Sequence, residues 1–319
     1  MLTMVRKVLV AGFGTAACLV VVGCGGAASD SGDAVVVTEP NANVPTTAAP
    51  SAAAAAPSAA PAAAAPAAAP TTSAAAPAPT STAPAAAAKS GGWGTLKGQV
   101  VFGSNGAPQE VLFAKGQAPK DPTVCAKDDP ILSERLVVDA ASKGVKNVLV
   151  FLTKPTAVND EAKAAAAKTM IEFDQKNCVF KPHVLAVMAG SKIELKSSDP
   201  VNHNVNAKFK SNSQFNSLLA AGQQLPYTPA SPERQPAQVT CDIHPWMLAY
   251  WMVLDHPYFA VTDANGNFEI KNVPSGAQKV VVWQEAAGYV TPVQGEEVSI
   301  AAGEPTTKSF TVDPGKIKK

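Results

Sequence analysis

The stretch Cys241-Asp242-Ile243-His244-Pro245-Trp246-Met247 decides how the rest of the chain is interpreted. It places a thiol, an imidazole and a thioether in one short loop. A second imidazole lies upstream, in Pro200-Val201-Asn202-His203-Asn204-Val205. Sulfur and imidazole ligands suit transition metals rather than magnesium or calcium. The sequence therefore predicts one metal site, with ligands His203, Cys241, His244 and Met247.

One thiolate, two imidazoles and a distant thioether are the ligands of mononuclear blue copper sites, which transfer single electrons. The soft thiolate suits Cu(I), and imidazole suits both oxidation states. Each of these residues alone is more often a packing side chain, so the prediction depends on all four together. Zinc is the main chemical alternative, and structural zinc is bound by cysteine, histidine and carboxylate rather than by a thioether.

The composition excludes several classes of function. The 319 residues carry a net charge of +1, which gives no electrostatic reason to expect nucleic acid as a partner. Four histidines are too few for a multicopper oxidase or a copper nitrite reductase. No Ser/His/Asp triad or carboxylate pair is evident. We therefore expect a carrier rather than an enzyme, with His183 and His256 structural or exposed.

The N-terminus has the pattern of an export signal. Arg6 and Lys7 precede an apolar run from Val8 to Val22, which is too short to span a bilayer comfortably. The run ends in Val21-Val22-Gly23-Cys24, which resembles the lipobox of bacterial lipoproteins. The resemblance implies that residues 1–23 are a signal peptide, that Cys24 is acylated, and that the protein is anchored to a membrane in the periplasm or cell envelope.

The residues after Cys24 bear on which membrane holds the protein and on how the folded part is connected to that membrane. Gly25 and Gly26 are not the aspartate that the lipoprotein resemblance links to inner-membrane retention, so the outer membrane is weakly favoured. An ordinary secreted protein with a chance cysteine is the alternative. Residues 24–92 are dominated by alanine and proline, with few large apolar groups. Such a segment has little with which to build a core and is predicted to be a disordered tether.

The five cysteines can each be assigned a role. Cys18 leaves with the signal peptide, Cys24 takes lipid and Cys241 binds the metal. Cys125 and Cys178 remain, and an oxidising compartment lets a disulfide between them persist. The competing interpretation is a second metal site with Cys178 and His183, for which two ligands are too few.

Many short apolar runs follow residue 92, broken by Gly, Pro, Asn and Ser, and they predict an all-β chain. An Ala/Lys-rich run between Asn159 and Met170 predicts one short helix, capped by Asn159 or Asp160. The fold class we expect is a Greek-key β-sandwich with a second, smaller β-sandwich. The expected strands include 96–102, 136–138, 145–152, 179–188, 191–196, 205–209, 251–254, 258–262, 267–270 and 280–283.

The chain from residue 257 to 319 has a pattern of its own. Asp263-Ala264-Asn265-Gly266 separates two strand-like runs, and Asn-Gly is a strong hairpin signal. Together with Val273-Pro274-Ser275-Gly276, this stretch resembles carboxypeptidase regulatory-like or transthyretin-like modules. Residues 93–176 form a β-rich region that either stands alone or belongs to this C-terminal sandwich. In the second case the metal domain is an insertion.

The metal domain, residues 177–256, resembles the plastocyanin/azurin family, the cupredoxins. The residues that carry the resemblance are Phe180-Lys181-Pro182, Gly190, Asp199, His203-Asn204-Val205 and the Cys-x-x-His-x-x-Met loop, whose tight spacing is most similar to amicyanin. The resemblance implies one type 1 copper ion, with nitrogens from His203 and His244, the thiolate of Cys241, and Met247 as weak axial ligand. Asn204 would join the two ligand loops and donate a hydrogen bond toward the sulfur.

The function expected from these features is transport of single electrons between redox proteins, with a cytochrome or a dehydrogenase among the partners that the family suggests. Pro245 and Trp246 are expected to form an apolar electron port, from which an edge of the His244 imidazole emerges. Two alternatives stay open: a non-redox envelope binding or structural module, and periplasmic copper handling.

Overall fold

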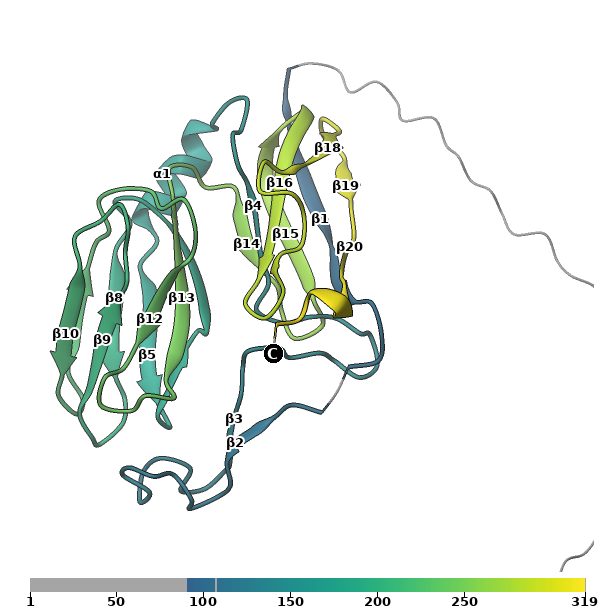
Figure 1. Cartoon of the computed structure of the whole chain (residues 1–319). Coiled ribbons are helices and arrows are strands. Elements are labelled where there is room, and N and C mark those ends of the chain that lie inside the picture. The colour runs from purple at the N-terminus through teal and green to yellow at the C-terminus, as the bar shows by residue number, and fades with distance from the viewer. Residues whose placement is uncertain (1–90, 107, 319) are drawn as a thin grey trace, which may run out of the picture. The chain divides into compact units, whose positions relative to one another are not determined.

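A computed structural model describes residues 91–106 and 108–318, shown in Figure 1. These residues fall within one compact unit, Pro79–Lys319. The predicted signal peptide, Cys24 and nearly all of the Ala/Pro-rich tether lie outside the described residues. Among the helices in the described part of the chain, none is long and apolar enough to cross a membrane.

The described chain is almost entirely β-structure, which confirms the predicted all-β class. The one α-helix of the described residues, α1 (Asp160–Lys168), lies where the sequence predicted it. The Asn159 side chain caps it by accepting a hydrogen bond from the Ala162 amide at 2.8 Å. The predicted strand at Leu136–Val138 is wrong. Only Val138 pairs there, in an isolated bridge with Val145.

The first sandwich contains the predicted ligands and is formed by two sheets. One has the order β10-β9-β12-β13-β7 and the other β11-β8-β5-β6. Apolar residues alternate with polar ones in β8, where Ile193 and Leu195 are buried. The strands are β5 (Ile171–Lys176), β6 (Val179–Lys181), β7 (Val184–Met188), β8 (Ile193–Ser197), β9 (His203–Ala207), β10 (Phe215–Leu219), β11 (Gln224–Tyr227), β12 (Ala237–Thr240) and β13 (Leu248–Leu254).

The core of this sandwich is aromatic. The indole of Trp251 meets the Phe173 ring edge-on at 4.8 Å between centroids, and both side chains are fully buried. Phe173 belongs to β5, which pairs in parallel with β8. The sandwich therefore begins at Ile171, and the predicted domain start at residue 177 is too late. The sequence missed β5 because Ile171–Lys176 follows the helix with no intervening turn signal.

The second sandwich combines strands from both ends of the described chain. β1 pairs with β15, and β4 pairs with β14 and β16, so the strands of the first sandwich lie between β4 and β14 in sequence. A cluster of buried side chains from β4, β7, β13 and β16 packs the two sandwiches together. The strands are β1 (Trp93–Phe102), β4 (Leu149–Leu152), β14 (Phe259–Val261), β15 (Asn267–Pro274), β16 (Gly276–Gln284), β17 (Gly288–Tyr289), β18 (Glu296–Ile300), β19 (Pro305–Thr307) and β20 (Phe310–Val312), followed by the 3₁₀ turn η1 (Pro314–Lys316).

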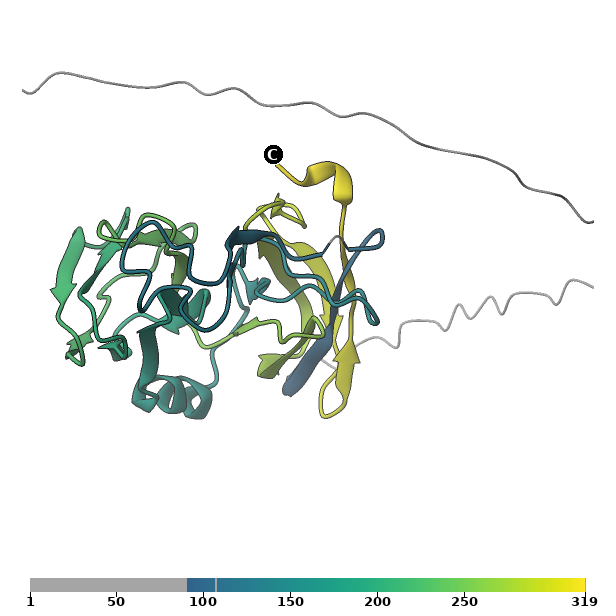
Figure 2. The ribbon, with the colours of Figure 1, turned by 90° about the horizontal axis from the view of Figure 1, so that it is seen from below.

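Residues 109–133 form a segment that we call the strap. It contains two short paired strands, β2 (Val111–Phe113) and β3 (Ile131–Leu132). Ala118, Cys125 and Ala126 of the strap are buried in the core of the first sandwich. Figure 2 shows the strap in front of the sandwich end when the molecule is seen from below. The sequence analysis expected no element here.

A buried carboxylate organises the loop between β9 and β10. Glu233 is 4% exposed and accepts hydrogen bonds from the amides of Lys210, Ser211 and Asn212 at 2.9–3.1 Å. Burial raises the pKa of Glu233, but these hydrogen bonds and one from the Asn212 side chain outweigh it and lower the pKa. The ionised side chain therefore stabilises the fold above the unfolded pKa near 4.5, and this contribution is lost as pH falls.

We expect Glu233→Gln to lower the free energy of unfolding at pH 7 by about 1.5–3 kcal/mol, because it removes hydrogen bonds to a charged acceptor. The measurement is urea unfolding at pH 7 and pH 4, where the variant should lose less stability on acidification than the parent. Glu304→Gln, at an exposed carboxylate, is the control. An unchanged pH profile in Glu233→Gln would contradict this account.

Candidate metal centre

The predicted ligands come from two neighbouring strands and one loop. His203 is the first residue of β9, and Cys241 directly follows β12. β9 and β12 are antiparallel neighbours, with Thr240 opposite Asn206, so the start of one lies beside the end of the other. His244 and Met247 follow in the loop that leads into β13. Sheet pairing thus brings together residues that are far apart in sequence.

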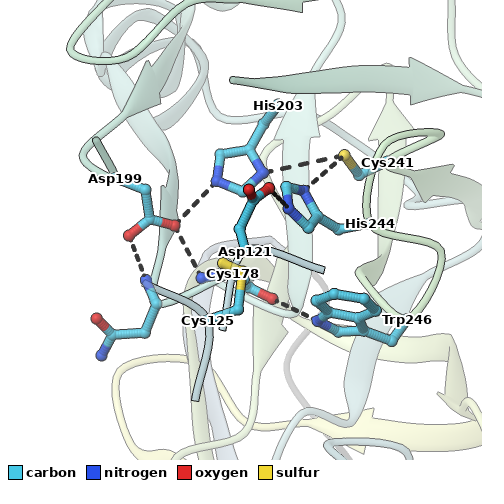
Figure 3. Close-up of a disulfide and its surroundings, with 9 residues drawn as sticks. Asp121, Cys125, Cys178, Asp199, His203, Cys241, His244 and Trp246 are labelled. Atoms are coloured by element: carbon cyan, nitrogen blue, oxygen red, sulfur yellow. Dashed lines mark hydrogen bonds and ion pairs between the residues drawn. A yellow bond between two sulfur atoms is a disulfide. The ribbon is translucent and has the colours of Figure 1, made fainter. Parts of the chain in front are cut away.

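Three of the predicted ligands converge in the structure, as Figure 3 shows. The Sγ atom of Cys241 lies 4.0 Å from Nδ1 of His203 and 3.9 Å from Nδ1 of His244. Their three ligand atoms all lie within 4.8 Å of one another, close enough to hold one metal ion. The side chains are 0–1% exposed. The geometry is that of a small, water-excluded site with one sulfur and two nitrogens.

Hydrogen bonds on the far side of each imidazole fix which nitrogen faces the sulfur. Nε2 of His203 donates to Asp199, and Nε2 of His244 donates to Asp121, each at 2.9 Å. A carboxylate can only accept, so the proton of a neutral imidazole sits on Nε2 and the lone pair on Nδ1. In this neutral form, which is the form that binds a metal, both lone pairs point toward Cys241, and carboxylate partners of this kind are typical of metal-bound histidines.

Asp199 is itself held firmly. Its two oxygens accept hydrogen bonds from the amides of Asn177 at 2.7 Å and Cys178 at 2.8 Å. Burial raises the pKa of Asp199, but the bond to His203 and these two amides outweigh it and lower the pKa. Asp199 therefore remains ionised at neutral pH and keeps the His203 ring in place.

The electrostatics of the site favour the thiolate form of Cys241, the form that binds metals. Burial raises the pKa of this thiol, but hydrogen bonds from His203 and the Asn204 amide outweigh it and lower the pKa. Burial lowers the pKa of His203, whereas Asp199 and Cys241 raise it, to about 9, so the metal-free imidazole is protonated at neutral pH and has to lose its Nδ1 proton when a metal binds. The pKa of His244 is lowered, chiefly by burial. Cys241 is a buried cysteine outside any disulfide.

Asn204 joins the two ligand loops. Its side-chain oxygen accepts from the Asp242 amide at 2.7 Å, and its Nδ2 donates to the Asp242 carboxylate at 2.9 Å. Its backbone amide, 3.5 Å from Sγ of Cys241, is the group that donates toward the sulfur. Asn206 and Asn216 also donate to Asp242. Sequence reasoning found Asn204 and missed the carboxylate at the centre of this network.

Met247 is buried at 1% exposure in the same core. Its amide donates to the His244 carbonyl at 2.9 Å, and its carbonyl accepts from the Cys241 amide at 3.3 Å. These bonds close the ligand loop on itself. That the thioether serves as axial ligand stays a prediction.

A disulfide fastens the strap beside this site. Cys125 of the strap is bonded to Cys178. These are the two cysteines that the sequence predicted to form a disulfide. Their sulfurs lie within 4.8 Å of a ring nitrogen of His244. Because both cysteines are consumed in the disulfide, the alternative metal site at Cys178 and His183 is wrong. His183 pairs with Glu285 at 2.6 Å, and Nε2 of His256 lies 2.9 Å from the Leu152 carbonyl, so both have structural partners.

The strap also changes the expected electron port. The predicted emerging edge of His244 is wrong, since its side chain is 0% exposed and Asp121 of the strap bonds its Nε2. Pro245 is exposed and Trp246 half-buried. The indole of Trp246 lies 5.1 Å from the His244 ring and 5.0 Å from that of Phe113, between centroids, and donates to the Cys178 carbonyl. The port function of Pro245 and Trp246 stays a prediction.

Two residues of the strap therefore contribute to the site without having been predicted. Asp121 lies four positions before Cys125, in a stretch with several other aspartates and lysines. Nothing in that pattern distinguishes it. Phe113 ends the apolar run Val111-Leu112-Phe113, which is too short to predict a contact with the metal loop. Both gain their significance from packing against a loop more than a hundred residues away.

Parts of the chain are similar to parts or all of several solved structures. The chain aligns with copper-containing nitrite reductase from Thermus scotoductus (20% identity, 27% of this chain and 22% of that one, TM-score 0.25) and with a purple cupredoxin from Nitrosopumilus maritimus (18%, 26% and 98%, TM-score 0.23). It also aligns with amicyanin from Paracoccus versutus (17%, 33% and 96%, TM-score 0.24). The chain thus spans about a fifth of the nitrite reductase.

No protein-family model matches the sequence, and no curated protein sequence matches it.

We expect Asp121→Ala to expose the His244 ring, because it removes the hydrogen bond that closes the strap over Nε2. Modification of metal-free protein by diethyl pyrocarbonate, read at His244 by mass spectrometry, should accelerate about tenfold, as expected for the loss of one hydrogen bond worth about 1.4 kcal/mol. Asp128→Ala changes an exposed aspartate of the same strap and is the control. Equal rates in the two variants would show that Asp121 does not protect the ring.

Proposed function

We propose that the protein is a blue copper carrier of single electrons, exported and lipid-anchored, and not itself an enzyme. The observation that carries this proposal is the convergence of the Nδ1 atoms of His203 and His244 on the Cys241 sulfur at 4.0 and 3.9 Å. Such a set of one thiolate and two imidazoles, with a buried methionine in the same loop, fits copper better than zinc. Bound copper would supply a one-electron couple.

The chain would hold the copper ion in a set of ligands, here called the cage, that has little freedom to move. Both imidazoles are tethered through Nε2 to carboxylates, and Asn204 with Asp242 holds the two ligand loops together. The cage is buried in an aromatic core, where close packing resists rearrangement. A ligand set that keeps its shape as the charge changes favours fast electron exchange. The Asn204 amide near the sulfur, with the apolar shell around it, would tune the potential.

Electrons would pass through Trp246, since the His244 ring does not reach the surface. The indole contacts the rings of both His244 and Phe113. Phe113 ends β2, whose Val111 and Leu112 are 54% and 37% exposed. An apolar surface of this kind suits brief contact with a redox protein. A cytochrome or a dehydrogenase is the partner class that the family resemblance suggests.

Export and membrane anchoring depend on the sequence motifs at residues 1–24. A tethered carrier could meet partners at a distance from the membrane through the Ala/Pro-rich segment. An exported site is also consistent with the disulfide between Cys125 and Cys178, which an oxidising compartment maintains.

Purified protein loaded with Cu(II) is expected to be intensely blue and to bleach on reduction, because a copper–thiolate bond carries the colour. Cys241→Ser should abolish the colour and leave the circular dichroism unchanged, whereas Thr240→Ser, at the neighbouring position, should keep it. A colourless copper-loaded protein would contradict the proposal. Rapid loss of copper to a chelator, with no reversible reduction, would instead indicate copper handling.

Trp246→Leu is expected to slow electron exchange with hexacyanoferrate several-fold while leaving the absorption spectrum of the copper site intact. The reason is that the substitution removes the aromatic contact between His244 and the surface. Trp93→Leu, at an indole of β1 that is 37% exposed, is the matched control. Unchanged exchange rates in Trp246→Leu would place the port elsewhere.

A further inference from the structure

The disulfide between Cys125 and Cys178 lies against the metal centre. The sulfurs of these two cysteines and a ring nitrogen of His244 lie within 4.8 Å of one another. Cys178 belongs to a second group of this kind, with Asp199 and His203. All five residues are buried. The two cysteines therefore add sulfur to a buried group of donors that already includes both histidines of the metal centre.

The disulfide is the later of two states of these cysteines. Disulfides form when a thiolate attacks another disulfide, so a newly made chain carries both cysteines as thiols. In the exchange the two thiols of this chain become the disulfide, and the disulfide of the oxidant becomes a dithiol, which balances atoms and electrons. The thiolate is the form of cysteine that binds a metal. Both sulfurs can therefore act as ligands before the bond closes and cannot do so afterwards.

The two cysteines differ in how firmly the fold holds them. The amide of Cys178 donates to Asp199 at 2.8 Å, and its carbonyl accepts from the indole of Trp246 at 3.0 Å. Cys125 lies between β2 and β3 of the strap, where the chain has no helix or strand. One sulfur is thus fixed, and the other can shift with the strap to make room for a metal ion between them. Without the disulfide the strap also loses its covalent attachment, which gives an ion a way in.

The donor set fits a soft ion. Thiolates select Cu(I) and zinc, whereas magnesium and calcium take oxygen ligands. Structural zinc is almost always bound by four ligands, and this group offers two sulfurs and one nitrogen. Cu(I), the softer of the two ions, therefore fits the group better.

We propose that Cys125, Cys178 and His244 form a site for Cu(I) while the two cysteines are thiols, and that closure of the disulfide removes this site. The two thiols release their protons when the ion binds. The site differs from the predicted blue copper centre in both of its sulfur ligands, although His244 is common to the two groups. It does not depend on the electron-transfer function proposed above.

The test uses a full-length host chain with Cys18→Ser, Cys24→Ser and Cys241→Ser, in which Cys125 and Cys178 are the remaining cysteines. Loss of Cys241 also removes the blue copper centre, so failure of that function cannot affect the result. The host chain is reduced with dithiothreitol in urea, then refolded and freed of reductant without oxygen. It should withdraw Cu(I) from its coloured bicinchoninate complex, and the bound ion should protect both cysteines from iodoacetamide. The oxidised host chain should do neither.

Two histidine variants of the host chain show whether the imidazole takes part. His244→Gln should weaken Cu(I) binding by about tenfold or more, since even the outer partners of metal ligands are worth about 10–100-fold. His183→Gln is the matched control, because glutamine can still donate to Glu285, the partner of His183. The proposal is overturned if the reduced host chain withdraws no Cu(I), if the oxidised host chain binds it equally well, or if the two histidine variants bind alike. A reduced chain that had lost its fold would give this last result.

Discussion

The hydrogen bonds from the histidine Nε2 atoms to Asp199 and Asp121 are the interactions on which the metal centre depends. A neutral imidazole has one proton and one lone pair, so fixing the proton on the far nitrogen fixes the lone pair on the near one. Asp199 is positioned by the amides of Asn177 and Cys178, and Asp121 by the strap that Cys125 fastens. One disulfide therefore supports the orientation of both rings.

The centre is formed by residues from two parts of the chain, the strap and the first sandwich. The chain leaves the second sandwich after β1, crosses the metal centre through the strap, and returns to that sandwich at β4. The second sandwich thus delivers Asp121 and Phe113 to a site whose ligands lie in the first. Because the His244 side chain is fully buried, the proposed electron route runs through Trp246 instead.

The sequence predicted what depends on local pattern or on residue chemistry. The Cys-x-x-His-x-x-Met loop and the upstream His203 predicted three side chains that converge in the structure, and the remaining cysteines, Cys125 and Cys178, are joined in a disulfide. The Asn159 cap marked the helix correctly. Long-range partners could not be predicted from the sequence. Nothing distinguishes Asp121 from the other aspartates of the strap until folding places it against His244. Leu136–Val138 has strand-like residues but lacks a neighbouring strand with which to form a ladder.

X-ray absorption at the copper edge tests the central claim most directly, because it reports the atoms bound to the metal. The account predicts one short copper–sulfur path and two imidazole nitrogens in the copper-loaded protein. It also predicts that these distances change little when the metal is reduced. A first shell of oxygen and nitrogen without a short sulfur path would contradict the account, as would a large change in coordination on reduction. Either result would mean that His203, Cys241 and His244 do not act as one rigid cage.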